Sequence, residues 1–250
     1  MALPLQATNG TALPVAWIRQ DQADPLIVCS QSGQATVSDG GQDTKINSHD
    51  LFGASLDAPL GSAVVLILNT LRRPLDLVEM YLKDGSQHGY PAVTDLNGGT
   101  LTTHQIPAAR VNPLDGSQMF GAGLWSFDPS GTEARGAMKF CTNGKLASAQ
   151  DDTQPVGPFL GVAFNLNCVD GYGMSPYGKS AVTADLVGKH GSLQKFYDNT
   201  VDDHDVPSEI GKEITIIAAH GLHGDSSGSG RWDFPKLCVT VYVRYKLPNE

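Results

Sequence analysis

The 250-residue sequence has no long apolar run and no excess of basic residues. Its longest apolar run, residues 63 to 68, is far shorter than the ~20 residues that a membrane-spanning helix needs. Lysine and arginine number 17 against 26 aspartates and glutamates, a formal net charge of −9, and no basic cluster is longer than Arg72-Arg73. We therefore expect neither a nucleic-acid partner nor purely electrostatic attachment to anionic lipid.

Cysteine motifs are also missing. The 4 cysteines form no CxxC pair and have no histidine at ligand spacing, so neither a zinc site nor a disulfide framework is indicated. Cys29, Cys168 and Cys238 lie within or beside apolar runs, where a free buried thiol is the usual state, with a disulfide as the alternative. We expect no metal and no cofactor.

Signals of catalysis are weak. The acidic run 202–205 lacks the spacing of a calcium loop and is expected to be solvated. His220 and His223 precede a Gly/Ser-rich loop with Asp225 and Asp233, which leaves a hydrolase as an alternative, but no serine lies in a GxSxG elbow. We expect that the protein is not an enzyme.

The first sixty residues are the least regular part of the chain. They begin without the charged and apolar regions of a signal peptide, so we expect either that a leader has been removed or that export uses another route. Apolar runs at 14–18 and 25–29 are consistent with a hairpin or two strands. A short amphipathic pattern follows, carried by Leu51, Phe52 and Leu56.

Residues 61–250 have the pattern of a single β domain. The 28 glycines and 15 prolines separate short apolar runs without forming a repeat. The clearest period of two is at 238–245, and helical spacing is clear only at 192–198. The sequence predicts a mainly β fold, an antiparallel β-sandwich of about ten strands with one or two short flanking helices.

A predicted strand from Phe159 runs into a loop that mixes small, polar and aromatic residues. The loop carries Asn165, Asn167, Tyr172 and Tyr177. A loop that exposes two tyrosines at the end of a rigid strand is a candidate recognition surface. The alternative, in which both rings pack onto the sandwich edge, is equally compatible with the sequence.

The order of motifs from about 63 to 244 resembles the actinoporin-like family of pore-forming cytolysins and related lectins. The motifs are VVLILN, LVEMYLKDGS, IPAARV, GSQMFGAGLWSF, FLGVAFNLNCVDGYG and SLQKFYDN. Compared with the family pattern, Asn167 stands where a proline is usual, and the loop is poorer in aromatic residues. The resemblance implies a β-sandwich that binds phosphocholine headgroups through an aromatic patch and inserts an N-terminal helix.

The resemblance also implies which residues act. Headgroup or sugar binding would fall on Ser86, Met119, Phe120, Asn165, Asn167, Tyr172, Tyr177, Phe196 and Tyr197. Membrane insertion would fall on Leu51, Phe52 and Leu56, within the segment 1–60, although extra strands there are an alternative. Aromatic rings bind a quaternary ammonium well, which agrees with a choline ligand.

The function that the resemblance implies is that of a secreted, soluble monomer that converts to a homo-oligomeric pore in a target-cell membrane, as a defence or insecticidal toxin would. Its partner would be a membrane lipid with a phosphocholine headgroup. The alternative is a lectin on the same sandwich, which binds a glycan and does not insert.

Overall fold

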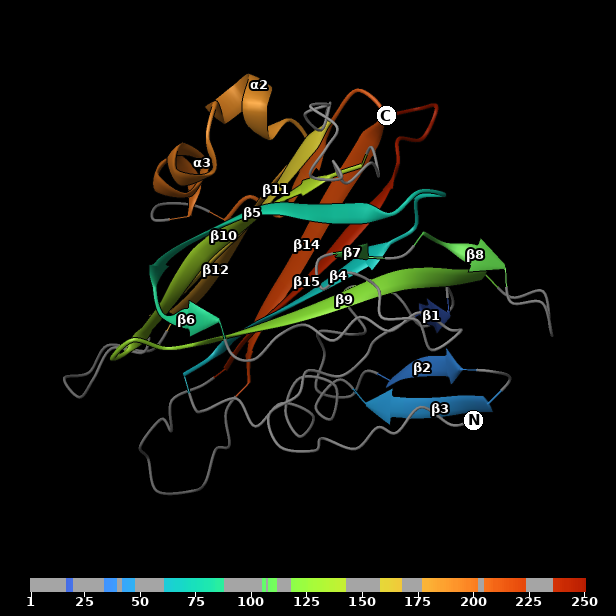
Figure 1. The fold of residues 1–250 in the computed structure, drawn as a ribbon, viewed down its shortest axis with the longest axis horizontal. Helices are drawn as coiled ribbons and strands as arrows, with labels where there is room; N and C mark the ends of the chain where they lie inside the picture. Colours follow the sequence, from blue (N-terminus) through green and yellow to red (C-terminus); the bar gives the residue numbers. More distant parts are fainter. Residues whose placement is uncertain are drawn as a thin grey trace, which may run out of the picture.

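The computed structural model describes residues 17–19, 34–39, 42–47, 61–87, 105–106, 108–111, 118–142, 158–167, 177–201, 205–223 and 236–250. Within them, two β-sheets lie face to face, and two short helices lie outside one sheet (Figure 1). The predicted mainly β class, with antiparallel sheets and short flanking helices, is confirmed.

The larger of the two sheets, which we call the large sheet, is antiparallel at every junction except one. Its strands, in spatial order, are β13 (Ser208–Ile210), β14 (Ile214–His223), β15 (Lys236–Tyr245), β4 (Ala63–Asn69), β9 (Gln118–Asp128), β1 (Trp17–Arg19), β2 (Gln34–Asp39) and β3 (Gln42–Asn47), with β6 (Ser86–Gln87) and β8 (Arg110–Val111) also paired to β9. β15 and β4 run parallel. Strands from the first sixty residues therefore extend this sheet beyond β9.

The other sheet, the small sheet, is antiparallel throughout. Its order is β12 (Tyr177–Thr183), β11 (Phe159–Asn167), β10 (Glu133–Cys141), β5 (Leu75–Asp84) and β7 (Gln105–Ile106). A seam closes one side of the sandwich, because Val206 bridges to Ala181 of β12 while the following strand, β13, pairs with β14.

The hydrophobic core lies between the two sheets. Val239, Val241 and Val243 of β15 alternate into it, as the period of two predicts. Aromatic pairs join the sheets: Phe127 stacks on Phe164 with 4.5 Å between ring centroids. The inner face of the small sheet therefore packs against the large sheet.

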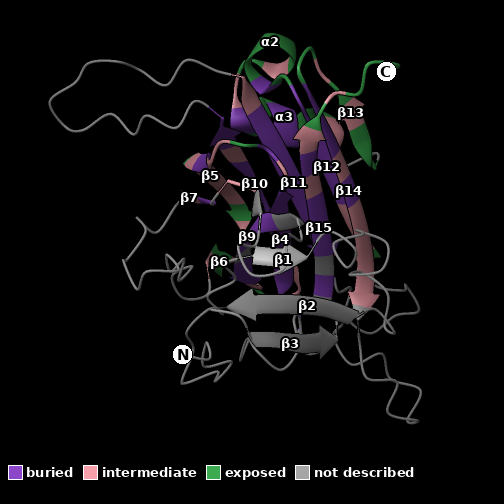
Figure 2. Ribbon diagram, turned by 90° about the vertical axis from the view of Figure 1, so that its right-hand side faces the viewer, coloured by how far each residue is buried: buried purple, intermediate pink, exposed green. Residues whose placement is uncertain are grey.

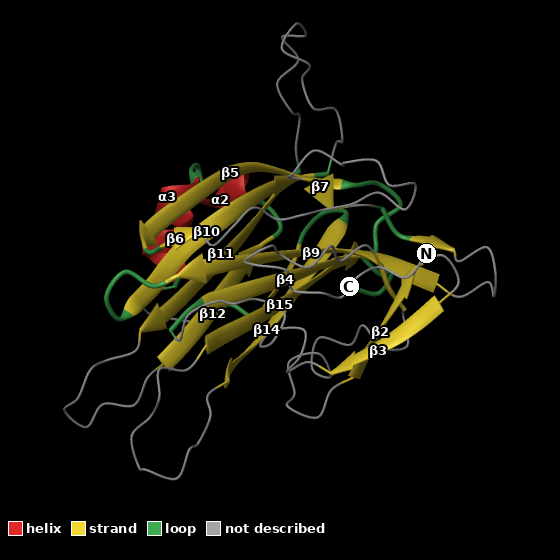
Figure 3. Ribbon diagram, turned by 60° about the horizontal axis from the view of Figure 1, so that its bottom comes forward, coloured by secondary structure: helices red, strands yellow, loops and turns green. Residues whose placement is uncertain are grey.

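The helices cover part of the outer face of the small sheet (Figure 3). They are α2 (Leu186–His190) and α3 (Leu193–Thr200), and the second confirms the helix predicted at 192–198. Ser192 caps α3, since its hydroxyl accepts a hydrogen bond of 3.2 Å from the Lys195 amide. No described helix is long and apolar enough to cross a bilayer.

The sandwich has two opposite ends, which we name by the residues found there. At the Asp84 end, β5 and β11 finish and β10 and β12 begin. At the Arg72 end, the loop between β4 and β5 meets the turn between β13 and β14. Figure 2 shows α2, β13 and the C-terminus together at the second end.

Candidate functional site

The outer face of the small sheet is polar near the Asp84 end. In β10, Ala134, Met138 and Phe140 belong to the core, so the alternate residues Glu133 and Arg135 lie on the opposite face. The strand register places Asp84 beside Arg135, and Asn167 between Glu133 and Tyr177. We call these five residues the polar row: Asp84, Glu133, Arg135, Asn167 and Tyr177.

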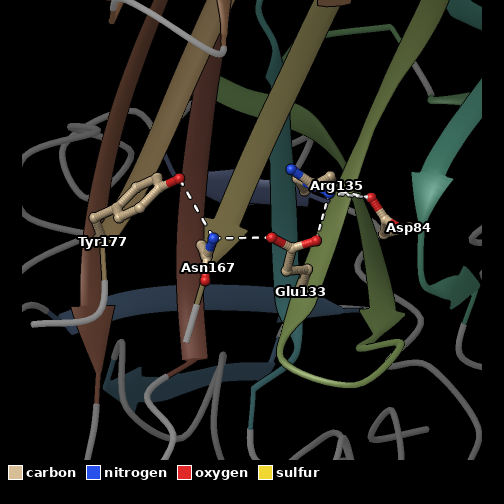
Figure 4. Close-up of polar contacts among 5 residues, drawn as sticks. All are labelled: Asp84, Glu133, Arg135, Asn167 and Tyr177. Carbon is tan, nitrogen blue, oxygen red and sulfur yellow. Dashed lines mark hydrogen bonds and ion pairs between the residues drawn. The ribbon is translucent and has the colours of Figure 1, made fainter. Parts of the chain in front are cut away.

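A continuous set of hydrogen bonds joins the polar row (Figure 4). Arg135 Nε donates to Asp84 Oδ2 over 2.8 Å, and Arg135 Nη2 also bonds Glu133 Oε2. Asn167 Nδ2 donates to Glu133 Oε1 over 2.8 Å and lies 3.4 Å from the Tyr177 hydroxyl. Because each side chain is held by its neighbour, the row is organised before any ligand arrives.

Charge in the polar row is partly balanced, because Arg135 lies against two carboxylates, Asp84 and Glu133. Burial alone would lower the pKa of the Arg135 guanidinium, but its hydrogen bond to Asp84 and the charges of Glu133 and Asp84 raise that pKa above its ordinary value. Arg135 is therefore a permanent cation between two carboxylates. Such a site offers donors and acceptors side by side with little net charge.

Two lysines lie beside the polar row, and one member of the row, Tyr177, is exposed. Lys179 Nζ lies 5.6 Å from the centroid of the Tyr177 ring, and Lys83 Nζ lies 5.3 Å from that of Tyr197. Tyr177 is 39% exposed. The exposed part of this ring lies next to an ammonium, an amide and a carboxylate, which is a suitable arrangement for a polar ligand.

The structure brings together some of the predicted binding residues. Asn167 and Tyr177 are members of the polar row, and the buried Asn165 lies two positions before Asn167 on β11. Ser86 is exposed at the Asp84 end, where β6 pairs with Asp128. Four of the predicted residues therefore lie at or near the Asp84 end: Ser86, Asn165, Asn167 and Tyr177.

The helix aromatics have a different environment from the one that the binding prediction needs. Phe196 and Tyr197 are 0% exposed. The Tyr197 ring packs 5.8 Å from Tyr81, and Phe196 lies 5.0 Å from His190. These rings hold α3 on the sheet and offer no free face, so we leave them out of the candidate site.

The remaining predicted residues are separated from the polar row or lie outside the described part. Phe120 is buried on the large sheet, its ring 5.7 Å from Tyr242, toward the opposite end of β9 from Ser86. Only the backbone of Met119 is described, and it pairs with β1 and β8. Tyr172 and the three predicted inserting residues lie outside the described residues: Leu51, Phe52 and Leu56.

Sequence reasoning missed Glu133 and Arg135. They flank a core residue, Ala134, just after the turn at 129–132, and their alternation was the only available signal. Partnership with Asp84 could not be seen, because 51 residues separate Arg135 from it along the chain.

A second polar cluster lies at the seam. The Ser180 hydroxyl is 2.9 Å from His220 Nδ1, and Asp205 Oδ1 is 3.8 Å from the same nitrogen while accepting from the Ser180 amide over 3.0 Å. In a nucleophilic triad the serine and the carboxylate bind opposite ring nitrogens of histidine. Here both approach Nδ1, so the cluster has the geometry of a structural tie between β12 and β14.

Comparisons with known proteins add little to these observations. No family model matches the chain, and no curated protein matches it. The solved structure of the "lipid binding protein Nakanori" is similar with a TM-score of 0.39 and 9% identity, covering 72% of this chain and 70% of that chain. That similarity is too low to support an argument, and membership of the actinoporin-like family stays a prediction from the sequence.

Proposed function

We propose that this protein is a membrane-binding protein, without catalytic activity, whose polar row holds the zwitterionic headgroup of a lipid such as phosphocholine. The observation that carries the proposal is the exposed Tyr177 ring, which lies beside the other members of the polar row and beside Lys179. A zwitterion needs both signs of charge within a few ångströms, and the polar row with Lys179 supplies both.

Each half of a phosphocholine group has partners in this set. The quaternary ammonium is attracted to an aromatic face and to carboxylate, which Tyr177 and Glu133 provide. The phosphate is attracted to an ammonium, which Lys179 provides. No strong net charge is needed, which suits a chain with a formal net charge of −9.

A glycan is the second candidate ligand, and one observation favours it. Arg135 already gives hydrogen bonds to Asp84 and Glu133, so its charge is largely used within the protein. Sugar hydroxyls, which both donate and accept, fit such a mixture of amide, paired carboxylate and ring. The protein would then be a lectin.

Pore formation and assembly into a homo-oligomer are a further proposal that rests on the sequence resemblance. The segment expected to insert, residues 51–56, lies outside the described residues. Release of dye from vesicles tests this step separately from binding, because a protein that binds without inserting leaves the vesicles intact.

The binding proposal is tested by co-sedimentation with neutral vesicles of phosphatidylcholine and sphingomyelin. Tyr177→Ala should weaken binding about tenfold, since it removes the exposed ring. Val78→Ala is the control: this apolar side chain is 37% exposed, similar to Tyr177, but lies in the middle of β5, outside the polar row. Equal binding by both variants would contradict the proposal, and binding to a glycan array instead of vesicles would favour the lectin.

A further inference from the structure

Three segments distant in sequence meet at the Arg72 end of the sandwich. The Arg72 amide donates to the Tyr245 hydroxyl over 3.2 Å, and Arg73 forms an ion pair of 3.5 Å with Glu213. The Lys246 amide donates to the Glu213 carbonyl over 2.9 Å. The loop after β4, the turn before β14 and the segment after β15 thus form one surface, which we call the basic end.

The basic end has a charge opposite to that of the whole chain. It gathers five cationic side chains and two carboxylates: Arg72, Arg73, Lys212, Arg244 and Lys246, with Glu213 and Glu250. Both carboxylates pair with arginines, whereas Arg72, Lys212 and Lys246 have no ion pair among the described residues. An excess of three positive charges therefore faces solvent on a chain of formal net charge −9. The sequence showed only Arg72-Arg73.

Large apolar side chains are exposed within the same surface. Ile210 is 51% and Leu247 is 54% exposed. Both residues are linked to Glu250. Ile210 pairs with Thr215, and the Thr215 hydroxyl donates to Glu250 Oε2 over 2.9 Å. The Leu247 amide donates to the same oxygen, Glu250 Oε2, over 3.1 Å, so Ile210 and Leu247 lie on the same part of the surface. Figure 2 shows exposed residues at β13 and along the C-terminal segment.

We propose that the basic end is a docking surface for a lipid bilayer that contains anionic lipids. Each lysine or arginine near such a surface raises the affinity of the protein for the membrane about fivefold. A soluble polyanion would use the cations alone, whereas a bilayer interface also accommodates Ile210, Leu247 and the Tyr245 ring. The exposed apolar residues therefore favour a bilayer over a soluble polyanion as the ligand of the basic end.

This surface is separate from the polar row. β5, a strand of 10 residues rising about 3.3 Å each, runs from one end of the sandwich to the other, which separates the two sites by about 30 Å. The docking proposal therefore does not depend on headgroup binding by the polar row, and the two sites can be tested independently.

The test uses the full chain and vesicles of phosphatidylglycerol alone, which hold no zwitterionic headgroup for the polar row. Lys212→Glu should weaken co-sedimentation on the order of tenfold. Lys195→Glu makes the same charge change at an exposed lysine of α3, outside the basic end, and should stay within about twofold of wild type. Tyr177→Ala should bind these vesicles like wild type.

The apolar part is tested with Leu247→Ser. We expect it to weaken vesicle binding about fivefold, also at high salt, while leaving binding to heparin unchanged, because heparin offers charge without an apolar phase. Circular dichroism and a thermal melt of each variant confirm that it is folded. Equal effects of Lys212→Glu and Lys195→Glu would overturn the docking proposal. Undiminished vesicle binding by Leu247→Ser would also contradict it, and would indicate that the basic end binds a soluble polyanion.

Discussion

The outer face of the small sheet has two halves that share strands and differ in composition. Toward α3, the strands β10, β11 and β12 present Ala137, Ala163 and Ala181, all fully buried beneath the helix. Toward the Asp84 end, the same face of the same strands presents Arg135, Asn167 and Tyr177. We call these the alanine half and the polar half.

The difference between the halves shows how side-chain size decides where a helix can lie. A Cβ placed at Gly161, within the alanine half, would come within 2.7 Å of Leu186 and 2.9 Å of Phe196. The helices can approach so closely only where the sheet carries alanine and glycine. Where the residues become long and polar, the two helices do not extend over the face, and Tyr177 is 39% exposed. One face therefore supports stability at one end and is free to bind at the other.

The largest expected loss of stability comes from a substitution in the alanine half. Phe196→Ala should lower the free energy of unfolding by about 3–5 kcal/mol, because it leaves a cavity beneath α3. Urea denaturation measures this from the midpoint, with an unchanged slope. Tyr177→Ala, in the polar half, should cost less than about 1 kcal/mol. Similar losses for both variants would remove the distinction between the two halves.

Introducing a leucine at each of two positions on β11 tests the difference between the two halves further. Ala163→Leu should destabilise the protein by about 1–3 kcal/mol, since its side chain would have to enter the packed contact with α3. Asn167→Leu is on the same strand and face, and should change stability by no more than about 1 kcal/mol, the cost of its hydrogen bonds. A tolerated leucine at 163 would show that α3 moves freely on the sheet.

The sequence predicted much of the fold because short-range patterns carry that information. The alternation in 238–245, the helical spacing at 192–198 and the glycine-separated apolar runs each act over a few residues. Pairing across the sheets is different. The parallel junction of β15 with β4 joins Leu237 to Ala63, and no local pattern indicates which distant strand a buried strand will choose.

The candidate site was predictable only in part, for the same reason. Asn167 and Tyr177 were found because they end one strand and begin the next around a single loop. The helical spacing at Phe196 fits either a buried or an exposed face until its partners are known, and in the structure this side chain is buried. The basic end was invisible, because its cations come from three separate parts of the chain.

A smaller effect is expected from removing the central cation of the polar half. Arg135→Met should cost about 1 kcal/mol, since Glu133 and Asp84 would face each other without Arg135, and both are partly exposed to screening water. Adding Glu133→Gln should recover part of the loss, because one of the two repelling charges is gone. A double variant less stable than Arg135→Met would show that hydrogen bonding of the Glu133 carboxylate matters more than repulsion.

The smallest expected effect concerns pH and the alanine half, where His190 ends α2 with its ring against Phe196. Burial lowers the pKa of His190, and Lys189 adds to this, while Glu209 and Asp185 oppose it. Above about pH 7 the imidazole is neutral whether the chain is folded or unfolded. As the pH falls through 6.5, the unfolded chain takes up the proton first, so stability is lost until the pH passes the folded pKa.

His190→Gln removes this titrating group and keeps a polar side chain at the end of α2. The free energy of unfolding of wild type should therefore fall relative to the variant between pH 7.5 and pH 5, by less than about 1 kcal/mol, because the ring is partly exposed. Urea midpoints at several pH values measure the difference. Parallel pH profiles for the two proteins would show that the imidazole against Phe196 is as well solvated as in the unfolded chain. A wild type that gains stability in acid relative to the variant would show that Glu209 and Asp185 favour the charged ring more than burial opposes it.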